Sequence, residues 1–276
     1  MKNLQEAQRT SDEFGLNELG YEPFLLSGRC WKVRFIGESV DDCGGGYSDS
    51  IAEICDELQS FTGGESDLPI LVQIPNCVDM EQDHSKVFVF NPLRAKSDNI
   101  KSVEKLFIFL GNLIGCALRQ GSPLSLRLHD SMWKLLQGEE LCLADIFDMD
   151  SAFHQRVNFI LSSTTDFSEA SVVTLSGEEI HCRSQSRAQF LQSCIRIRNA
   201  EFKKCADLVR FGIGEVVPLR YLNIFTVREL CHLVSGEIDI PIGLLKKVTT
   251  YKGIEPDSNY ANWFWEVLSE FSAWER

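Results

Sequence analysis

Residues 106–118 read LFIFLGNLIGCAL, and this stretch decides what kind of core the chain can form. Apolar residues occupy nearly every position around a helix of this sequence, whereas a surface helix would carry a polar face. The stretch is too short and too interrupted to cross a bilayer, so it predicts the centre of a large core. Gly111 and Gly115 lie four residues apart on one helix face, where they let a second backbone approach closely.

A second amphipathic segment follows, after a helix stop at Gly121 and Pro123. Its apolar face comprises Leu126, Leu128, Met132, Trp133, Leu135 and Leu136. We expect the two segments to form a hairpin of core helices without a chemical role.

Length and charge limit the class of protein. A chain of 276 residues can bury a sizeable core as one large domain or two subdomains. The formal charge of −13 argues against a nucleic-acid binder, because such proteins neutralise phosphates with Lys and Arg. Residues 1–13 are polar and acidic, unlike a signal peptide, and no glycosylation sequon is present. We expect a cytoplasmic location, with the nucleus also open, and no membrane partner.

The cysteines and histidines give no sign of a metal site or a cofactor. The closest two of the ten cysteines, Cys194 and Cys205, are too far apart for a zinc-binding pair, so buried reduced thiols are expected. Cys231 and His232 are adjacent, and on a helix they point about 100° apart, which disfavours a thiol hydrolase. The five histidines are isolated in sequence: His84, His129, His154, His181 and His232.

Local patterns predict a mixture of helices and short strands. Alternation predicts a half-buried strand at 29–38, and three glycines at 44–46 predict a tight backbone turn. This turn lacks the Gly-Lys-Ser/Thr of a phosphate loop. A helix is expected at 50–60, strands at 70–74 and 87–90, a β-hairpin at 171–181 turning at Ser176-Gly177, and a long helix at 185–211.

Eight short motifs, taken together, resemble the HECT ubiquitin-ligase domain, in that family's order and with roughly its spacing between about residue 29 and residue 276. They are WKVRFIGE at 31–38, DDCGG at 41–45, FVFNP at 88–92, FLGNLIG at 109–115, DIFDMD at 145–150, LCHLVSG at 230–236, TYKG at 250–253 and FWEVL at 264–268. The sequence looks most like the giant HECT ligases that also carry RCC1-type repeats.

The resemblance implies an α+β, mostly helical N-lobe over residues 1–252, in which a small subdomain at about 162–211 binds a ubiquitin-conjugating enzyme (E2). It also implies a hinge at 253–260, with Gly253 and Pro256, and the first helix of a C-lobe at 261–276. Ubiquitin would arrive through the E2, and no cofactor is implied. The protein substrates are not indicated.

The family's catalytic cysteine lies in a Thr-Cys-Phe motif, and no cysteine of this chain precedes Phe. The sequence therefore predicts that this chain alone does not ligate ubiquitin, because a thioester needs that thiolate. The interpretations left open are part of a HECT ligase and a non-catalytic E2-binding module or competitor, such as a splice product or gene fragment.

The resemblance places the E2 contact at Phe190, where the family has an aromatic residue lining the groove. Cys194 stands where several members have a second aromatic, and a plain core role for Phe190 is the alternative. From residue 181 to 210 the chain carries seven basic and two acidic residues, a net of +5. This basic helix either steers a partner or holds solvated side chains whose stems cover apolar surface.

Overall fold

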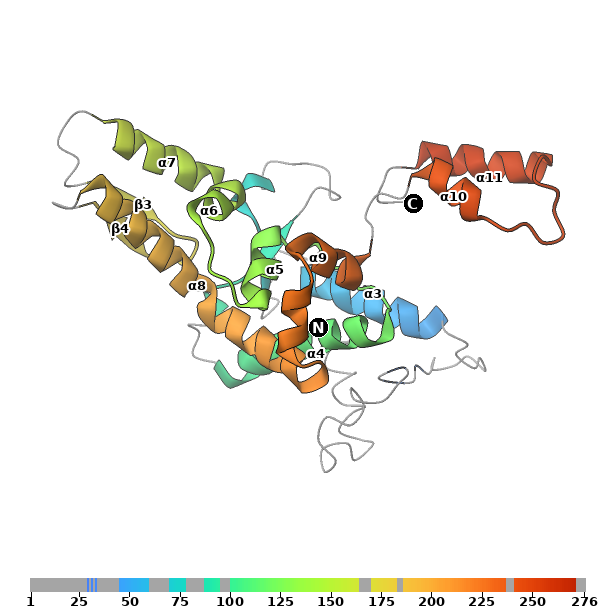
Figure 1. The fold of residues 1–276 in the computed structure, drawn as a ribbon, viewed down its shortest axis with the longest axis horizontal. Coiled ribbons are helices and arrows are strands. Elements are labelled where there is room, and N and C mark those ends of the chain that lie inside the picture. Colours follow the sequence, from blue (N-terminus) through green and yellow to red (C-terminus); the bar gives the residue numbers. More distant parts are fainter. Residues whose placement is uncertain are drawn as a thin grey trace, which may run out of the picture.

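The computed structural model describes residues 29, 31, 33, 45–59, 70–77, 87–94, 100–163, 170–182, 186–236 and 241–271. The fold is α+β and mostly helical, with two small antiparallel sheets (Figure 1). The elements are α3 (Gly45–Gln59), β1 (Leu71–Gln73), η1 (Pro75–Cys77), β2 (Phe88–Phe90), α4 (Ile100–Gln120), α5 (Asp130–Gln137), α6 (Leu143–Met149), α7 (Ser151–Ser162), β3 (Ser171–Val173), β4 (Glu179–His181), α8 (Arg187–Val216), η4 (Leu219–Ile224), α9 (Val227–Ser235), α10 (Ile242–Val248) and α11 (Asn259–Glu270). Among these residues, no helix is long and apolar enough to cross a membrane.

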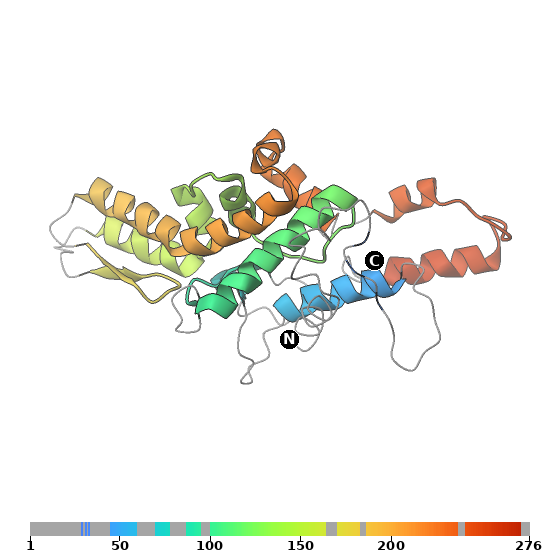
Figure 2. The ribbon, with the colours of Figure 1, turned by 90° about the horizontal axis from the view of Figure 1, so that it is seen from below.

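The crossing of α4 and α8 forms the centre of the core (Figure 2). Phe107, Leu110 and Ile114 of α4 are almost entirely buried, as are Val209 and Ile213 of α8. Residues 106–118 therefore lie at the centre of the core, as their apolar sequence predicts.

Glycines from both helices allow the close crossing. A Cβ atom added to Gly111 would collide with the carbonyl oxygen of Val209 and come within 2.9 Å of the Cα of Gly212. A Cβ on Gly212 would collide in turn with the carbonyl oxygen of Ile108. The predicted close backbone approach at Gly111 is confirmed, and its partner is a helix about a hundred residues further along the chain.

The expected hairpin of α4 with the following helix is wrong in its pairing. The six apolar side chains of the second segment are all buried, but α5 packs mainly against α9 and α8. Leu126 and Leu128 precede α5 in extended backbone, where the amide of Phe88 donates to the carbonyl of Arg127 and the amide of His129 donates to the carbonyl of Phe88. The connection thus runs along β2 and carries α5 away from α4.

The N-terminal half contributes β1, β2 and α3. The strands pair antiparallel with Leu71 opposite Phe90, which confirms the two strands predicted at 70–74 and 87–90. The glycine turn expected at 44–46 is wrong for Gly45 and Gly46, which belong to α3. Tyr47 is already on the buried face of that helix, so the helix begins earlier than predicted. The strand expected at 29–38 falls almost entirely outside the described residues.

A small unit projects from one end of the molecule (Figure 1). It comprises α7, the hairpin β3–β4 and the N-terminal half of α8, and we call it the small subdomain. The β3–β4 hairpin is confirmed, with Val172 paired to Ile180 and Gly177 at a φ of 77° in its turn. We include α7 because it packs on β3, and the predicted bounds of about 162 and 211 stay a prediction. The long helix predicted at 185–211 is confirmed as α8.

The helices α10 and α11 lie together at the opposite end (Figure 1). Trp265 of α11 is buried, its indole N–H donates to the Tyr251 hydroxyl at 2.8 Å, and the ammonium of Lys246 lies over its ring. No side chain of α10 is buried. This pair of helices, the α10–α11 hairpin, is the least buried helical part of the described chain.

Candidate functional site

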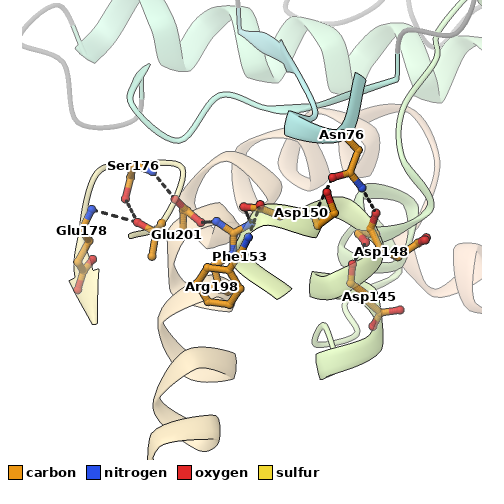
Figure 3. A network of polar contacts seen from close by, with 12 residues as sticks. Asn76, Asp145, Asp148, Asp150, Phe153, Ser176, Glu178, Arg198 and Glu201 are labelled. Carbon is orange, nitrogen blue, oxygen red and sulfur yellow. Dashed lines mark hydrogen bonds and ion pairs between the residues drawn. The ribbon is translucent and has the colours of Figure 1, made fainter. Parts of the chain in front are cut away.

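The small subdomain meets the rest of the molecule at a buried cluster of charges centred on Arg198 of α8 (Figure 3). The Arg198 side chain is fully buried, and its guanidinium donates to Glu201 at 2.8 Å and to Asp150 at 3.4 Å. The rings of Phe153 and Phe202 face the guanidinium carbon at 5.1 Å and 5.8 Å. A guanidinium between two carboxylates and two aromatic rings is held in a single orientation.

Asp150 joins this cluster to the start of α7. Its second carboxylate oxygen accepts from the amide of Phe153, so the side chain also caps α7. On the other side of the α6–α7 junction, the Asn76 side chain donates to the carbonyl of Asp148 and accepts from the amide of Ser151, both at 2.7 Å. The junction is therefore bound to η1 and to α8 at the same time.

Glu201 joins the cluster to the turn of the β3–β4 hairpin. One of its oxygens accepts from the amide of Ser176, beside the Thr174 hydroxyl, which accepts from the amide of Glu178 at 3.0 Å. Burial raises the pKa of Glu201, and the Arg198 charge and the Ser176 amide act in the opposite direction. A continuous run of polar contacts thus joins Asp150, Arg198, Glu201 and the hairpin turn, and Asn76 binds the backbone on either side of Asp150 (Figure 3).

Phe190 and Cys194, the residues predicted to contact an E2, both lie in the core of the small subdomain. Neither side chain is exposed, and Cys194 is close enough to Cys182, just after β4, for the two thiols to interact electrostatically. This burial favours the alternative of a core aromatic for Phe190. Direct contact with an E2 stays a prediction.

Among the described residues of the small subdomain, the large apolar side chains that are exposed are Phe159 of α7 and Val173 of β3, at 63% and 54% exposure. Arg156 connects the two elements, because its guanidinium lies over the Phe159 ring and its Nε donates to the Ser171 carbonyl. Neither Phe159 nor Val173 belongs to one of the eight motifs. Phe159 is set apart only by its position off the buried stripe of Phe153, Val157 and Ile160.

The basic side chains predicted to form an electrostatic feature on α8 are largely paired within the protein. Arg198 is buried with two acids, Arg210 donates to the carbonyl of Leu136, Lys203 pairs with Asp207, and Lys204 pairs with Glu104. These contacts favour a structural role for the charges over the steering of a partner.

Most of the described cysteines are buried in the core. Burial raises the pKa of Cys55, Cys194 and Cys205 to about 12, which opposes formation of the reactive thiolate. Among the described cysteines, Cys142 is exposed and Cys231 is partly buried, so the expectation of buried thiols does not hold for Cys142. Within the described ranges, no three His, Cys, Asp or Glu side chains gather as metal ligands would.

Gly253 and Pro256, the predicted hinge residues, lie in the loop between α10 and α11. Gly253 has a φ of 76°, which favours glycine. This loop joins two helices that pack on each other, whereas the chain passes from α9 to α10 between Gly236 and Pro241. The hinge at 253–260 stays a prediction.

Comparison with known proteins agrees with this architecture. The HECT-domain (ubiquitin-transferase) family matches residues 56–276. This chain belongs to the HECT-domain family. The family predicted from the eight motifs is confirmed, and six of the motifs lie within the matched residues.

Several HECT ligases are similar to the chain. The E3 ubiquitin-protein ligase HERC2 of Homo sapiens is 40% identical over 95% of this chain, and that of Mus musculus is 40% identical over 92%. The probable E3 ubiquitin-protein ligase HECTD4 of Homo sapiens is 25% identical over 88% of it. The chain spans only 5–7% of the length of these relatives.

Proposed function

We propose that this chain is the N-lobe portion of a HECT-type E3 ubiquitin-protein ligase, and that it recruits a ubiquitin-loaded E2 through its small subdomain. Membership of the HECT family supports an E2 and ubiquitin as partners in general. The observation that carries the docking site is the projecting small subdomain with exposed Phe159 and Val173. Exposed aromatic and aliphatic side chains on a rigid unit are typical anchors of a protein interface.

A second candidate is a non-catalytic E2-binding module or competitor. It is favoured by the absence of Thr-Cys-Phe from the chain and by the raised thiol pKa values of Cys55, Cys194 and Cys205. Both candidates require E2 binding and differ in the later transfer of ubiquitin. We infer that this polypeptide by itself forms no ubiquitin thioester.

The docking proposal is tested by titrating the chain with a panel of E2 enzymes and comparing the wild type with Phe159→Ser and Val173→Ser. Both side chains are exposed, so these variants keep the fold. Loss of an aromatic anchor is worth about 2 kcal/mol, so Phe159→Ser should raise Kd more than tenfold. Phe211→Ser, which changes an equally exposed phenylalanine of α8 outside the small subdomain, is the matched control. Unchanged affinity in both test variants would show that the docking face lies elsewhere.

Phe190 and Cys194 have a different expected phenotype, because both are fully buried. We propose that they support the docking unit from within. Phe190→Ala should lower the free energy of unfolding by about 3–5 kcal/mol and weaken E2 binding through that loss. If Phe190→Ala weakens E2 binding and leaves unfolding unchanged, Phe190 contacts the E2 directly.

Addition of activating enzyme, ATP and ubiquitin to the mixture of this chain and an E2 tests catalysis. We expect no reductant-sensitive ubiquitin adduct on this chain. An adduct that disappears when one of the ten cysteines is replaced would exclude the non-catalytic alternative.

A further inference from the structure

The Arg198 cluster joins elements that are far apart in the sequence. It contacts the first turn of α7 through Asp150, the middle of α8 through Arg198 and Glu201, and the hairpin turn through Ser176. Asn76 holds the same α6–α7 junction to η1, next to β1. Every element of the small subdomain therefore reaches this one place, where the subdomain joins the rest of the chain (Figure 3).

Stability alone does not account for a buried cluster of this kind. The removal of a guanidinium and two carboxylates from water is costly, and well-packed apolar residues of similar volume are often as stabilising. The charges differ from apolar residues in their directionality. Arg198 reaches Asp150 only when α7 stands in one arrangement about α8, and Glu201, on the same helix as Arg198, reaches the Ser176 amide only when the hairpin turn stands in one arrangement. A cluster of one cation and two anions also makes the two contacts interdependent, because loss of either acid changes the position of the guanidinium.

We propose that the Arg198 cluster is a lock that holds α7 and the β3–β4 turn in one orientation about α8, and that the two elements release together when the lock is broken. The lock sets the arrangement of the elements that carry Phe159 and Val173. Its relevance to E2 affinity therefore rests on the proposed function, whereas the mechanical coupling does not.

Hydrogen exchange followed by mass spectrometry on the whole chain tests the coupling, with Asp150→Asn and Glu201→Gln as near-isosteric variants. Asp150→Asn removes a charge that touches α7 and Arg198 but not the hairpin turn. We expect it to accelerate exchange at least tenfold in residues 174–178 as well as in α7. Glu201→Gln should accelerate exchange in the first turn of α7, which Glu201 does not contact. Peptides from residues 103–117 of α4 should exchange as in the wild type.

Lys203→Met is the matched control, because Lys203 forms an exposed ion pair with Asp207 on the same helix. It should leave exchange in both distant elements unchanged. Arg198→Met should combine both effects, and if it does not fold, the two acid variants decide the question alone. The lock is refuted if each acid variant accelerates exchange only in the element it touches, because the cluster would then form only local bonds. It is also refuted if exchange in α4 accelerates equally, because the cluster would then contribute only to global stability.

The E2 titration separates the two proposals. If wild-type chain binds an E2, Asp150→Asn and Glu201→Gln should weaken that binding at least threefold, and Lys203→Met should not. If the wild-type chain binds no E2, but each acid variant still accelerates hydrogen exchange in the element that it does not touch, the lock stands and the proposed function fails. If the E2 binds normally to all variants, and neither acid variant accelerates hydrogen exchange in the element that it does not touch, the lock fails and the proposed function stands.

Discussion

The α4–α8 crossing and the α10–α11 hairpin are both made of helices rich in apolar residues. The crossing buries most of these residues, whereas the hairpin leaves most of them exposed. At the crossing, Gly111 and Gly212 bring two backbones into contact, and Phe107, Leu110, Ile114, Val209 and Ile213 are almost fully buried. In the hairpin, Trp265 and Ala261 are buried, while Trp263, Phe264 and Val267 are about half exposed or more.

This difference indicates that a helix buries most of its apolar surface when its partner can approach closely along its length. Two glycines per crossing supply that approach, since each lacks the side chain that would keep the axes apart. The hairpin has one buried aromatic ring, that of Trp265, and its indole N–H donates to the Tyr251 hydroxyl. We therefore expect the two regions to respond very differently to substitution.

The largest effect is expected for Gly212→Ala. The new Cβ would collide with the backbone carbonyl of Ile108 and come within 2.9 Å of its carbon, and backbone atoms cannot move aside as a flexible side chain can. Overpacking of this kind should lower the free energy of unfolding by about 3 kcal/mol or more, as measured by urea denaturation. Gly111→Ala should have a similar effect, because its contacts are reciprocal.

Two other helical glycines serve as controls for Gly212→Ala. A Cβ on Gly214 would meet the Leu219 side chain at an ordinary 3.5 Å, and a Cβ on Gly243 of α10 would meet nothing within 4 Å. Alanine should be tolerated at both, with a gain of up to about 1 kcal/mol from helix propensity. If Gly214→Ala is as harmful as Gly212→Ala, the close crossing is not the cause.

A smaller effect is expected at the edge of the main core, where Lys134 of α5 pairs with Asp145 of α6 at 2.8 Å. Burial alone would raise the pKa of Asp145, but the Lys134 ammonium and the Cys142 amide together lower it. The hydrogen bond to Asp145 raises the pKa of Lys134. Asp145→Asn should cost about 1 kcal/mol at neutral pH.

The pH dependence of this loss follows from the sign of the shift. A carboxyl with a lowered folded pKa stabilises the fold above its unfolded pKa, about 3.9, and that contribution disappears as the pH falls through the folded pKa. Wild type and Asp145→Asn should therefore converge in strongly acidic solution. A difference that persists there would come from packing and not from the charge. At high pH the wild-type advantage should also fade as Lys134 loses its proton.

Much of the fold could be predicted from patterns of apolar residues and glycines. The burial of residues 106–118, the close approach at Gly111, the two strands, the hairpin at 171–181 and the long helix α8 all follow from local sequence. The partner of Gly111 could not be predicted in this way, because Gly212 lies in a different helix and nothing local links the two. The error at Gly45 and Gly46 has a related origin, since the buried face of α3 outweighs the flexibility of glycine.

The candidate site was less predictable. The resemblance placed the E2 contact at Phe190 and Cys194, which are buried, and gave no weight to the exposed Phe159. One signal for the Arg198 cluster was present in the sequence. Cys194, Arg198 and Phe202 recur every four residues, so a basic residue stands on the buried stripe of α8. Such a residue must find acidic partners, but the sequence does not indicate that they are Asp150 and Glu201.

The smallest effect on the main core is expected for Trp265→Ala in the α10–α11 hairpin. Removal of this ring abolishes the hydrogen bond to Tyr251 and the contact with Lys246, so amide exchange in α10 and α11 should accelerate strongly. Since the hairpin lies apart from the α4–α8 crossing, exchange in residues 103–117 should stay as in the wild type. The free energy of unfolding of the main transition, measured in urea, should change by less than about 0.5 kcal/mol. Trp263→Ala, at an exposed position of α11 two residues before Trp265, should alter neither region. Deletion of residues 257–276 should likewise preserve the main transition and improve solubility, because it removes exposed aromatic surface. A cooperative loss of the main core in either case would show that the hairpin is an integral part of it, and the contrast between the two regions would fail.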